Sequence, residues 1–224
     1  MLRRLVGALF AILALPLWAS PVSAATVAGT VVAVSGPCAV PGRPLKSGDA
    51  LQVSDTVDVP AGCNLKLRMA DGSVVLVSPG SSLTVAGYNV SGGARYARLS
   101  LRQGLLRILV TPVGGPSTFE VSTAVGTASV RSDSADWLIK AQAGSAQVGV
   151  LAGKVDFKSA TTGRSVSIPK RWGTRLEAQL DPVLPRVWSY SEFTSSMDLT
   201  RCCQSSQPKE ESSPSNPFRR ESNP

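Results

Sequence analysis

The sequence predicts an all-β fold, a single domain of short strands arranged as an irregular β-solenoid or a sandwich. Three observations favour it. Apolar and polar residues alternate over short runs, the period of a strand with one buried face. Glycine, proline, serine and aspartate separate most of these runs, as turn residues do. Helical periodicity is present only weakly, over residues 187–199.

The N-terminus has the three parts of a secretory signal. An Arg3-Arg4 pair supplies positive charge, Leu5–Trp18 is apolar, and Val22-x-Ala24 is a small-residue cleavage pattern. The apolar run is short for a membrane span and contains a proline. We therefore expect residues 1–24 to be cleaved. The mature chain should be periplasmic or secreted, with no membrane span.

The all-β domain is expected to occupy residues 25–180, beginning with a β-branched strand over residues 26–34. Its central unit is a hairpin: Leu65–Met69 alternates, Asp71-Gly72 suits a tight turn, and Val74–Val77 returns. Arg102-Gln103-Gly104 is interpreted as a turn between two strands. The other expected strands are residues 51–53, 56–59, 83–86, 99–101, 105–110, 119–123, 127–131, 137–141, 146–151, 154–158 and 165–168.

Two segments follow the last expected strand. Trp188, Tyr190 and Phe193 cluster in residues 181–203, which we expect to dock onto the core through these aromatic rings. The alternative is that the rings form an exposed contact for a partner. Residues 204–224 are rich in serine, proline and charge, a composition typical of a disordered tail.

Four cysteines allow three pairings. Cys38 and Cys63 lie within the folded region, and an oxidising compartment permits a structural disulfide between them, which we favour. Cys202 and Cys203 are adjacent, an awkward spacing for a mutual bond, so pairing with another chain stays open. The chain has no histidine and no Cys-x-x-Cys spacing, so no metal site or cofactor is expected.

The absence of histidine also excludes Ser-His-Asp and Cys-His catalysis. No Gly-x-Ser-x-Gly, Ser-x-x-Lys or phosphate-binding glycine loop is present. One hypothesis is that Asp133 and Asp136 form the carboxylate pair of a glycosidase, but aspartates beside serines are more often loop residues. We predict that the protein is not an enzyme and has no catalytic residues.

The formal charge of +8 would suit an anionic partner, but the basic residues are scattered and the export signal argues against nucleic acid. Lys66 and Arg68 share the outward face of one expected strand, and Arg98 and Arg102 that of another. If those strands are neighbours, the four residues form a cationic surface for anionic envelope polymers such as peptidoglycan or lipopolysaccharide. The alternative is a solvated face that keeps the sheet soluble.

Short motifs in a fixed order resemble the FecR-type domain, named for the ferric-citrate regulator of Gram-negative bacteria. The resemblance covers roughly residues 27–176, although residues 130–133 replace the family's Arg-Gly-Thr. The motifs are Leu45-x-x-Gly48-Asp49, Asp71-Gly72-Ser73, Pro79-x-Ser81, Leu101-x-x-Gly104-x-x-Arg107, Phe119-x-Val121-x-Thr123 and Gly153-x-Val155.

The resemblance implies a non-enzymatic extracytoplasmic module that binds another envelope or surface protein, in signalling or surface assembly. Strand addition at exposed sheet edges would supply the contact. Ferric-citrate-type regulators carry a cytoplasmic anti-sigma segment ahead of a membrane helix. Nothing before Leu5 could be that segment, so we expect a stand-alone module without a direct sigma-factor role. The alternative function is binding of anionic envelope polymers through the cationic surface.

Overall fold

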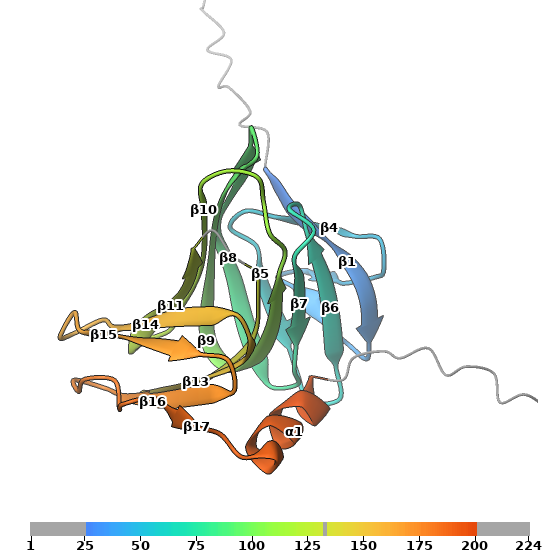
Figure 1. The fold of residues 1–224 in the computed structure, drawn as a ribbon. Helices are drawn as coiled ribbons and strands as arrows, with labels where there is room; N and C mark the ends of the chain where they lie inside the picture. Colours follow the sequence, from blue (N-terminus) through green and yellow to red (C-terminus); the bar gives the residue numbers. More distant parts are fainter. Residues whose placement is uncertain (1–25, 132–133, 201–224) are drawn as a thin grey trace, which may run out of the picture.

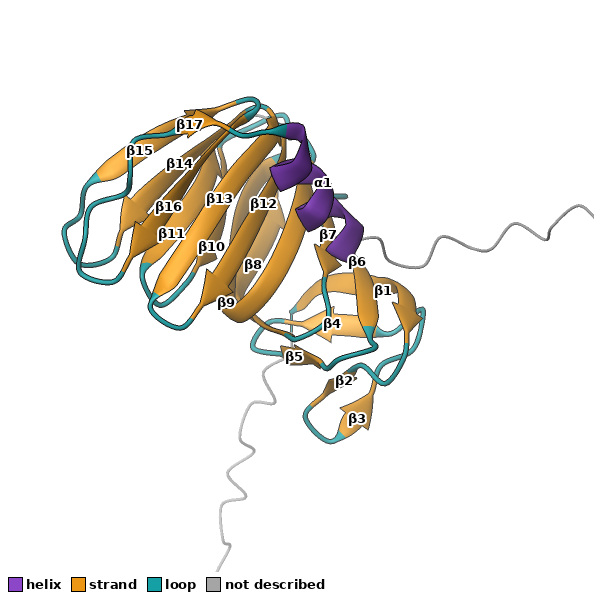
Figure 2. Cartoon of the chain, turned by 90° about the horizontal axis from the view of Figure 1, so that it is seen from below, coloured by secondary structure: helices purple, strands orange, loops and turns teal. Residues whose placement is uncertain are grey.

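The computed structural model describes residues 26–131 and 134–200. Two β-sheets face each other across one hydrophobic core and share a single long strand, with one short helix packed outside (Figures 1 and 2). This confirms the all-β prediction. The expected signal peptide and the expected disordered tail lie outside the described residues.

Sheet A is antiparallel throughout and holds both strands of the predicted central hairpin. Its order is β4 (Ala50–Gln52), β1 (Val27–Ser35), β6 (Asn64–Met69), β7 (Val74–Val77), the second half of β9 (Ala94–Val110), β12 (Ala135–Gln142), β13 (Ser145–Ala152), β16 (Trp172–Glu177) and β17 (Arg186–Val187).

Sheet B faces sheet A and has one parallel pair, β9 with β10. Its order is β3 (Arg43–Pro44), β2 (Ala39–Val40), β5 (Thr56–Val59), β8 (Ser81–Ser91), the first half of β9, β10 (Ser117–Ser122), β11 (Gly126–Arg131), β14 (Lys154–Ser159) and β15 (Ser165–Pro169).

Strand β9 passes from sheet B into sheet A without a turn, which overturns the interpretation of residues 102–104. Up to Gln103 it pairs with β8, and from Gly104 onward with β12. Gly104 has φ +103°, and a Cβ there would overlap Ser81. The Leu105 backbone N–H donates to the Ser81 hydroxyl over 3.1 Å. The two motif residues therefore bend the strand between the sheets.

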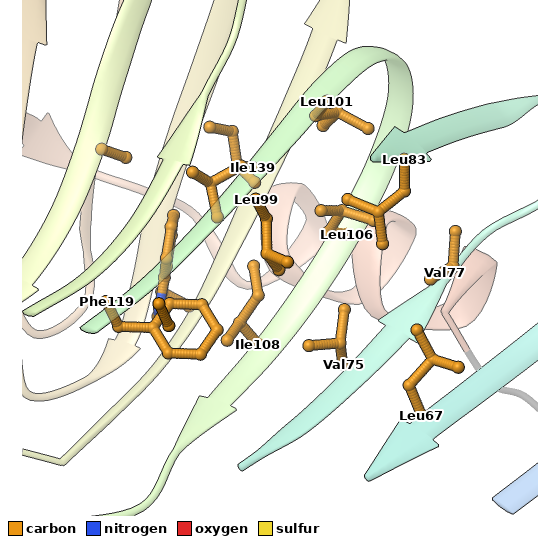
Figure 3. Packing of buried hydrophobic residues seen from close by; sticks show 14 of the residues in the cluster. Leu67, Val75, Val77, Leu83, Leu99, Leu101, Leu106, Ile108, Phe119 and Ile139 are labelled. Atoms are coloured by element: carbon orange, nitrogen blue, oxygen red, sulfur yellow. The ribbon is translucent and has the colours of Figure 1, made fainter. Parts of the chain in front are cut away.

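The core lies between the sheets, and Figure 3 shows part of it. In β6 the alternation predicted from sequence is observed, because Leu65, Leu67 and Met69 are buried. Strand β8 is longer than the predicted strand 83–86, since Gly87 accommodates a register shift instead of ending it. The largest fully buried side chains include Trp137, Phe119 and Phe157.

Helix α1 (Tyr190–Leu199) matches the weak helical periodicity. It begins at a capping box in which the Ser189 hydroxyl accepts from the Glu192 N–H and the Glu192 carboxylate accepts from the Ser189 N–H. Phe193 packs against Leu105 and Leu138 on the outer face of sheet A. Within the described residues, no helix is long and apolar enough to cross a membrane.

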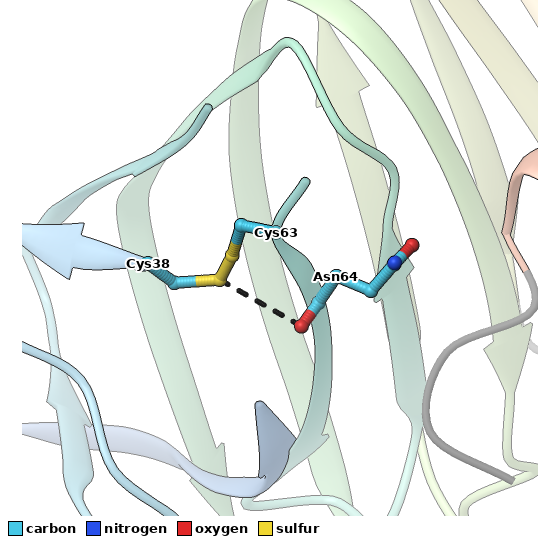
Figure 4. The surroundings of a disulfide bond; sticks show 3 residues. All are labelled: Cys38, Cys63 and Asn64. Carbon is cyan, nitrogen blue, oxygen red and sulfur yellow. Dashed lines mark hydrogen bonds between the residues drawn. A yellow bond between two sulfur atoms is a disulfide. The ribbon is translucent and has the colours of Figure 1, made fainter. Parts of the chain in front are cut away.

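Cys38 and Cys63 are joined by a disulfide with a Cα–Cα distance of 5.6 Å (Figure 4). Both cysteines are buried, and the Cys38 sulfur lies 3.6 Å from the Asn64 carbonyl oxygen. Cys38 precedes β2 of sheet B and Cys63 precedes β6 of sheet A. The bond therefore ties the two sheets together at the N-terminal end of the sandwich.

Candidate functional site

The most strongly organised polar group is a buried network around Asp71, in the turn between β6 and β7. Its Oδ2 lies 2.5 Å from Arg95 Nη1, and both side chains are fully buried. Asp71 also accepts from the Tyr88 hydroxyl over 2.6 Å and from the Ser73 hydroxyl over 2.6 Å. Arg95 also donates to the Ser117 hydroxyl over 2.6 Å.

Hydrogen bonding decides the ionisation of this network. Burial raises the pKa of the Asp71 carboxyl, but donors from Ser73, Tyr88 and Arg95 outweigh it and lower that pKa below its ordinary value. Burial and the hydrogen bond to Asp71 raise the pKa of Tyr88. The network therefore holds a buried carboxylate against a buried guanidinium.

The network joins four parts of the chain at one end of the sandwich, one of which is Tyr88 on β8. Asp71 and Ser73 lie at the β6–β7 turn, Arg95 at the start of β9, and Ser117 at the start of β10. Most of its groups are paired with one another, although Arg95 Nε has no hydrogen-bond partner among the described residues. The side chains of Asp71 and Arg95 are fully buried, so we interpret the arrangement as structural. The sequence predicted Asp71 as a turn residue and missed Arg95, which lies between the expected strands 83–86 and 99–101.

The predicted cationic surface is not assembled. Lys66 and Arg68 point outward from β6 in sheet A, whereas Arg98 and Arg102 point outward from the sheet B half of β9. The two pairs therefore lie on opposite outer faces of the sandwich. Arg98 pairs with Glu120 at 3.4 Å, and Arg102 lies 3.8 Å from an aspartate on β5.

The posed carboxylate pair does not support catalysis either. Asp136 lies on β12, where Arg107 binds it through Nε at 2.9 Å and Nη2 at 2.7 Å. The hydrogen bond to Asp136 raises the pKa of the Arg107 guanidinium. Asp133 lies outside the described residues. Among the residues that are described, no cluster of three cysteine, aspartate or glutamate side chains could hold a metal ion.

Among the described residues, several exposed apolar side chains lie along the free edge of sheet A. We call this group the apolar ridge; its residues are Leu180, Val183, Leu184, Val187 and Tyr190, exposed by 55%, 60%, 81%, 57% and 82%. Single exposed apolar residues are ordinary, and here five fall within eleven positions of the sequence.

The ridge is held against the edge of the sheet by the backbone on either side of β17. Val183 N–H donates to the Arg175 carbonyl over 2.9 Å, and Trp188 N–H donates to the Arg171 carbonyl over 3.1 Å. The Trp188 ring lies over Gly149 and Gly173, where a Cβ at either position would overlap it. Of the three aromatic residues predicted to dock, Trp188 and Phe193 pack inward with ring centroids 5.2 Å apart, and Tyr190 is exposed.

Beside the ridge is a hollow of about 320 Å³. Arg186 and Glu192 border it and pair over 2.5 Å. Hydrogen bonds from Arg186 and from the Ser189 backbone lower the pKa of Glu192 to about 2. The ridge therefore has an apolar centre with an ion pair at its border, the pattern of many protein–protein contacts.

Comparison with known proteins gives one family and one structural likeness. Residues 55–156 match the family model described as FecR protein. The fold is similar to two crystal structures of a "putative anti-sigma factor" from Parabacteroides distasonis, each with a TM-score of 0.51 and 17% identity. The alignments cover 62% of this chain and 63% or 62% of the other, so the chain spans under two thirds of those relatives. No curated protein gives a significant match.

Proposed function

We propose that this chain, which carries a FecR-type domain over residues 55–156, is a non-enzymatic module of envelope signalling that works by binding another protein. The single observation that carries the proposal is the apolar ridge. A solvent-facing row of large apolar side chains is unfavourable in an isolated domain and is accounted for if a partner covers it. The FecR match and the anti-sigma name of the similar structures support a regulatory role.

Strand addition at the ridge is the mode of contact that the topology favours. Strand β17 is the last strand of sheet A and contains only Arg186 and Val187. A partner segment could extend the sheet by pairing with this edge, and alternate side chains of the ridge would fill pockets on the partner. The partner would be an envelope or surface protein, in keeping with the exported location predicted from residues 1–24.

Site-specific crosslinking tests the proposal. The full chain with a photoreactive amino acid at position 184 is irradiated in its native envelope, and adducts are identified by mass spectrometry. The matched control carries the same group at position 66, on the outer face of sheet A and away from the ridge. We expect one discrete protein adduct from position 184, which is lost on adding Val187→Asp. Equal labelling from both positions would contradict the ridge as the contact.

The proposed location is tested separately. N-terminal sequencing of the protein recovered from the periplasm or medium should begin at Ala25. A chain that starts at Met1, or that is retained in the cytoplasm, would count against export. Either result leaves the crosslinking test of the ridge interpretable.

A further inference from the structure

The outer face of sheet B is rich in polar side chains. Across β10, β11 and β14 it carries hydroxyl and charged side chains, which form a hollow of about 530 Å³. Glu120, Thr127, Ser129, Arg131, Asp156 and Lys158 line this hollow. Ser129 is only 9% exposed and forms part of its floor. We call this hollow the polar groove.

A second, smaller hollow continues the polar groove along the same face. It measures about 260 Å³ and is bordered by Asn89 on β8, Tyr96 on β9 and Thr118 on β10, and its lining also includes Arg95 and Ser117 of the buried network. Thr118 is two residues from Glu120 on the same strand and registers with both Tyr96 and Arg131. The two hollows together extend across β8, β9, β10, β11, β14 and β15. At ~4.8 Å between neighbouring strands, this is a length of about 24 Å.

The hydrogen-bonding groups in the polar groove are largely unused. Within residues 26–131 and 134–200, the side chains of Arg131, Asp156 and Lys158 make no ion pair or hydrogen bond. Donors and acceptors that lack partners inside a hollow are available to a ligand that offers both.

The arrangement of charge selects the kind of ligand. Glu120 and Asp156 lie in one cross-strand row on either side of Ser129, while Arg131 and Lys158 lie in the rows next to it. Opposite charges therefore interleave, and a polyanion would meet two carboxylates at the centre of the groove. A ligand without charge, rich in hydroxyl or amide groups, can bond to donors and acceptors alike.

Tyr96 supplies the remaining feature such a ligand requires. Its side chain is exposed by 43%, and the Arg98 guanidinium lies 5.4 Å from the ring centroid. An exposed phenol ring held beside a polar groove can pack against the apolar face of a sugar ring while its hydroxyl stays hydrated.

We propose that the polar groove and Tyr96 bind an uncharged polysaccharide chain that lies across the strands of sheet B. Its several linked sugar rings match the length of the two hollows, and their hydroxyls match the mixed groups that line them. This binding does not depend on the protein partner proposed for the apolar ridge, which lies at the edge of sheet A.

Titration of the isotope-labelled mature chain with cellohexaose and with chitohexaose tests the proposal by NMR. At least one hexasaccharide should give saturable amide shifts confined to the six sheet B strands that border the two hollows, β8, β9, β10, β11, β14 and β15. Tyr96→Ala and Asp156→Ala should each weaken that binding at least fivefold while leaving the spectrum dispersed. Tyr190→Ala, a matched exposed tyrosine on α1, should bind as the wild type does.

Three results would overturn the proposal. One is the absence of saturable shifts with both hexasaccharides. Another is unchanged affinity in Tyr96→Ala and Asp156→Asn, the latter a conservative variant that keeps the shape of the groove. The third is tighter binding of an oligogalacturonate of the same length, which would show that negative charge is what the face recognises.

Discussion

The buried ion pair between Asp71 and Arg95 offers the sharpest test of how this fold is held together. In Arg95→Met the guanidinium is replaced by an apolar chain of similar length, and Asp71 keeps three donor groups from Ser73 and Tyr88. In Asp71→Leu, Arg95 keeps only the Thr111 carbonyl and polar hydroxyls as acceptors, so a buried cation is left without its counter-ion.

The expected magnitudes follow from these contacts. Removing one partner of a buried pair costs about 3–5 kcal/mol, because the other charge stays desolvated. We expect Arg95→Met to lower the free energy of unfolding by about 3 kcal/mol, since the remaining donors still stabilise the Asp71 carboxylate. Asp71→Leu should lower the free energy of unfolding by an amount at the upper end of this range, about 5 kcal/mol.

A double-mutant cycle in urea measures the coupling. The combined variant Asp71→Leu with Arg95→Met leaves no buried charge, so its loss should be smaller than the sum of the single losses by about 2 kcal/mol or more. The m-value should stay unchanged, which would show that the same surface unfolds. Additive single losses, or losses under about 1 kcal/mol each, would refute the claim that the two charges depend on each other.

Three further predictions concern the same framework. The Asp71 carboxyl has a lowered pKa in the fold, so the stability that its ionised form contributes is complete above about pH 4 and is lost as pH falls below that. The free energy of unfolding, measured as a function of pH, should therefore decline less steeply in acid for Asp71→Asn than for the wild type. Replacing Cys38 and Cys63 by serine should lower the free energy of unfolding by about 3 kcal/mol in urea, and an unchanged midpoint would contradict a constraining bond. Gly104→Ala should lower the free energy of unfolding by at least about 2 kcal/mol. Gly80→Ala, also at positive φ but with open space around its Cβ position, should lower it by about 1 kcal/mol. Equal losses of stability would exclude the overlap at position 104.

Local sequence patterns were sufficient to predict much of the fold. The β6–β7 hairpin could be predicted because its strands alternate and its turn is Asp-Gly, so neighbouring residues alone specify it. The crossing of β9 could not, because Arg102-Gln103-Gly104 has the composition of a turn. What keeps the strand extended there is Ser81, which comes from a distant part of the sequence and binds the Leu105 N–H.

The functional surfaces were harder to predict for a related reason. The sequence placed Lys66 and Arg98 on the outward side of their own strands, and the structure places both there. It could not show that β6 and the first half of β9 belong to different sheets, which depends on pairing between distant segments. The Asp71–Arg95 contact was hidden in the same way, because a buried arginine requires a partner that only the fold brings near.

The division of the chain into two sheets also separates the two proposed contacts. The apolar ridge borders sheet A, beside the part of its outer face that α1 covers, and the polar groove lies on the outer face of sheet B. A protein at the ridge and a polysaccharide in the groove would therefore not compete for the same atoms. β13 pairs with β16 in sheet A, and β11 pairs with β14 in sheet B. Each surface is therefore formed by strand pairs of a different sheet. Val187→Asp should thus abolish crosslinking without changing hexasaccharide affinity, and Tyr96→Ala should do the reverse; loss of both contacts in either variant would mean that the surfaces act as one.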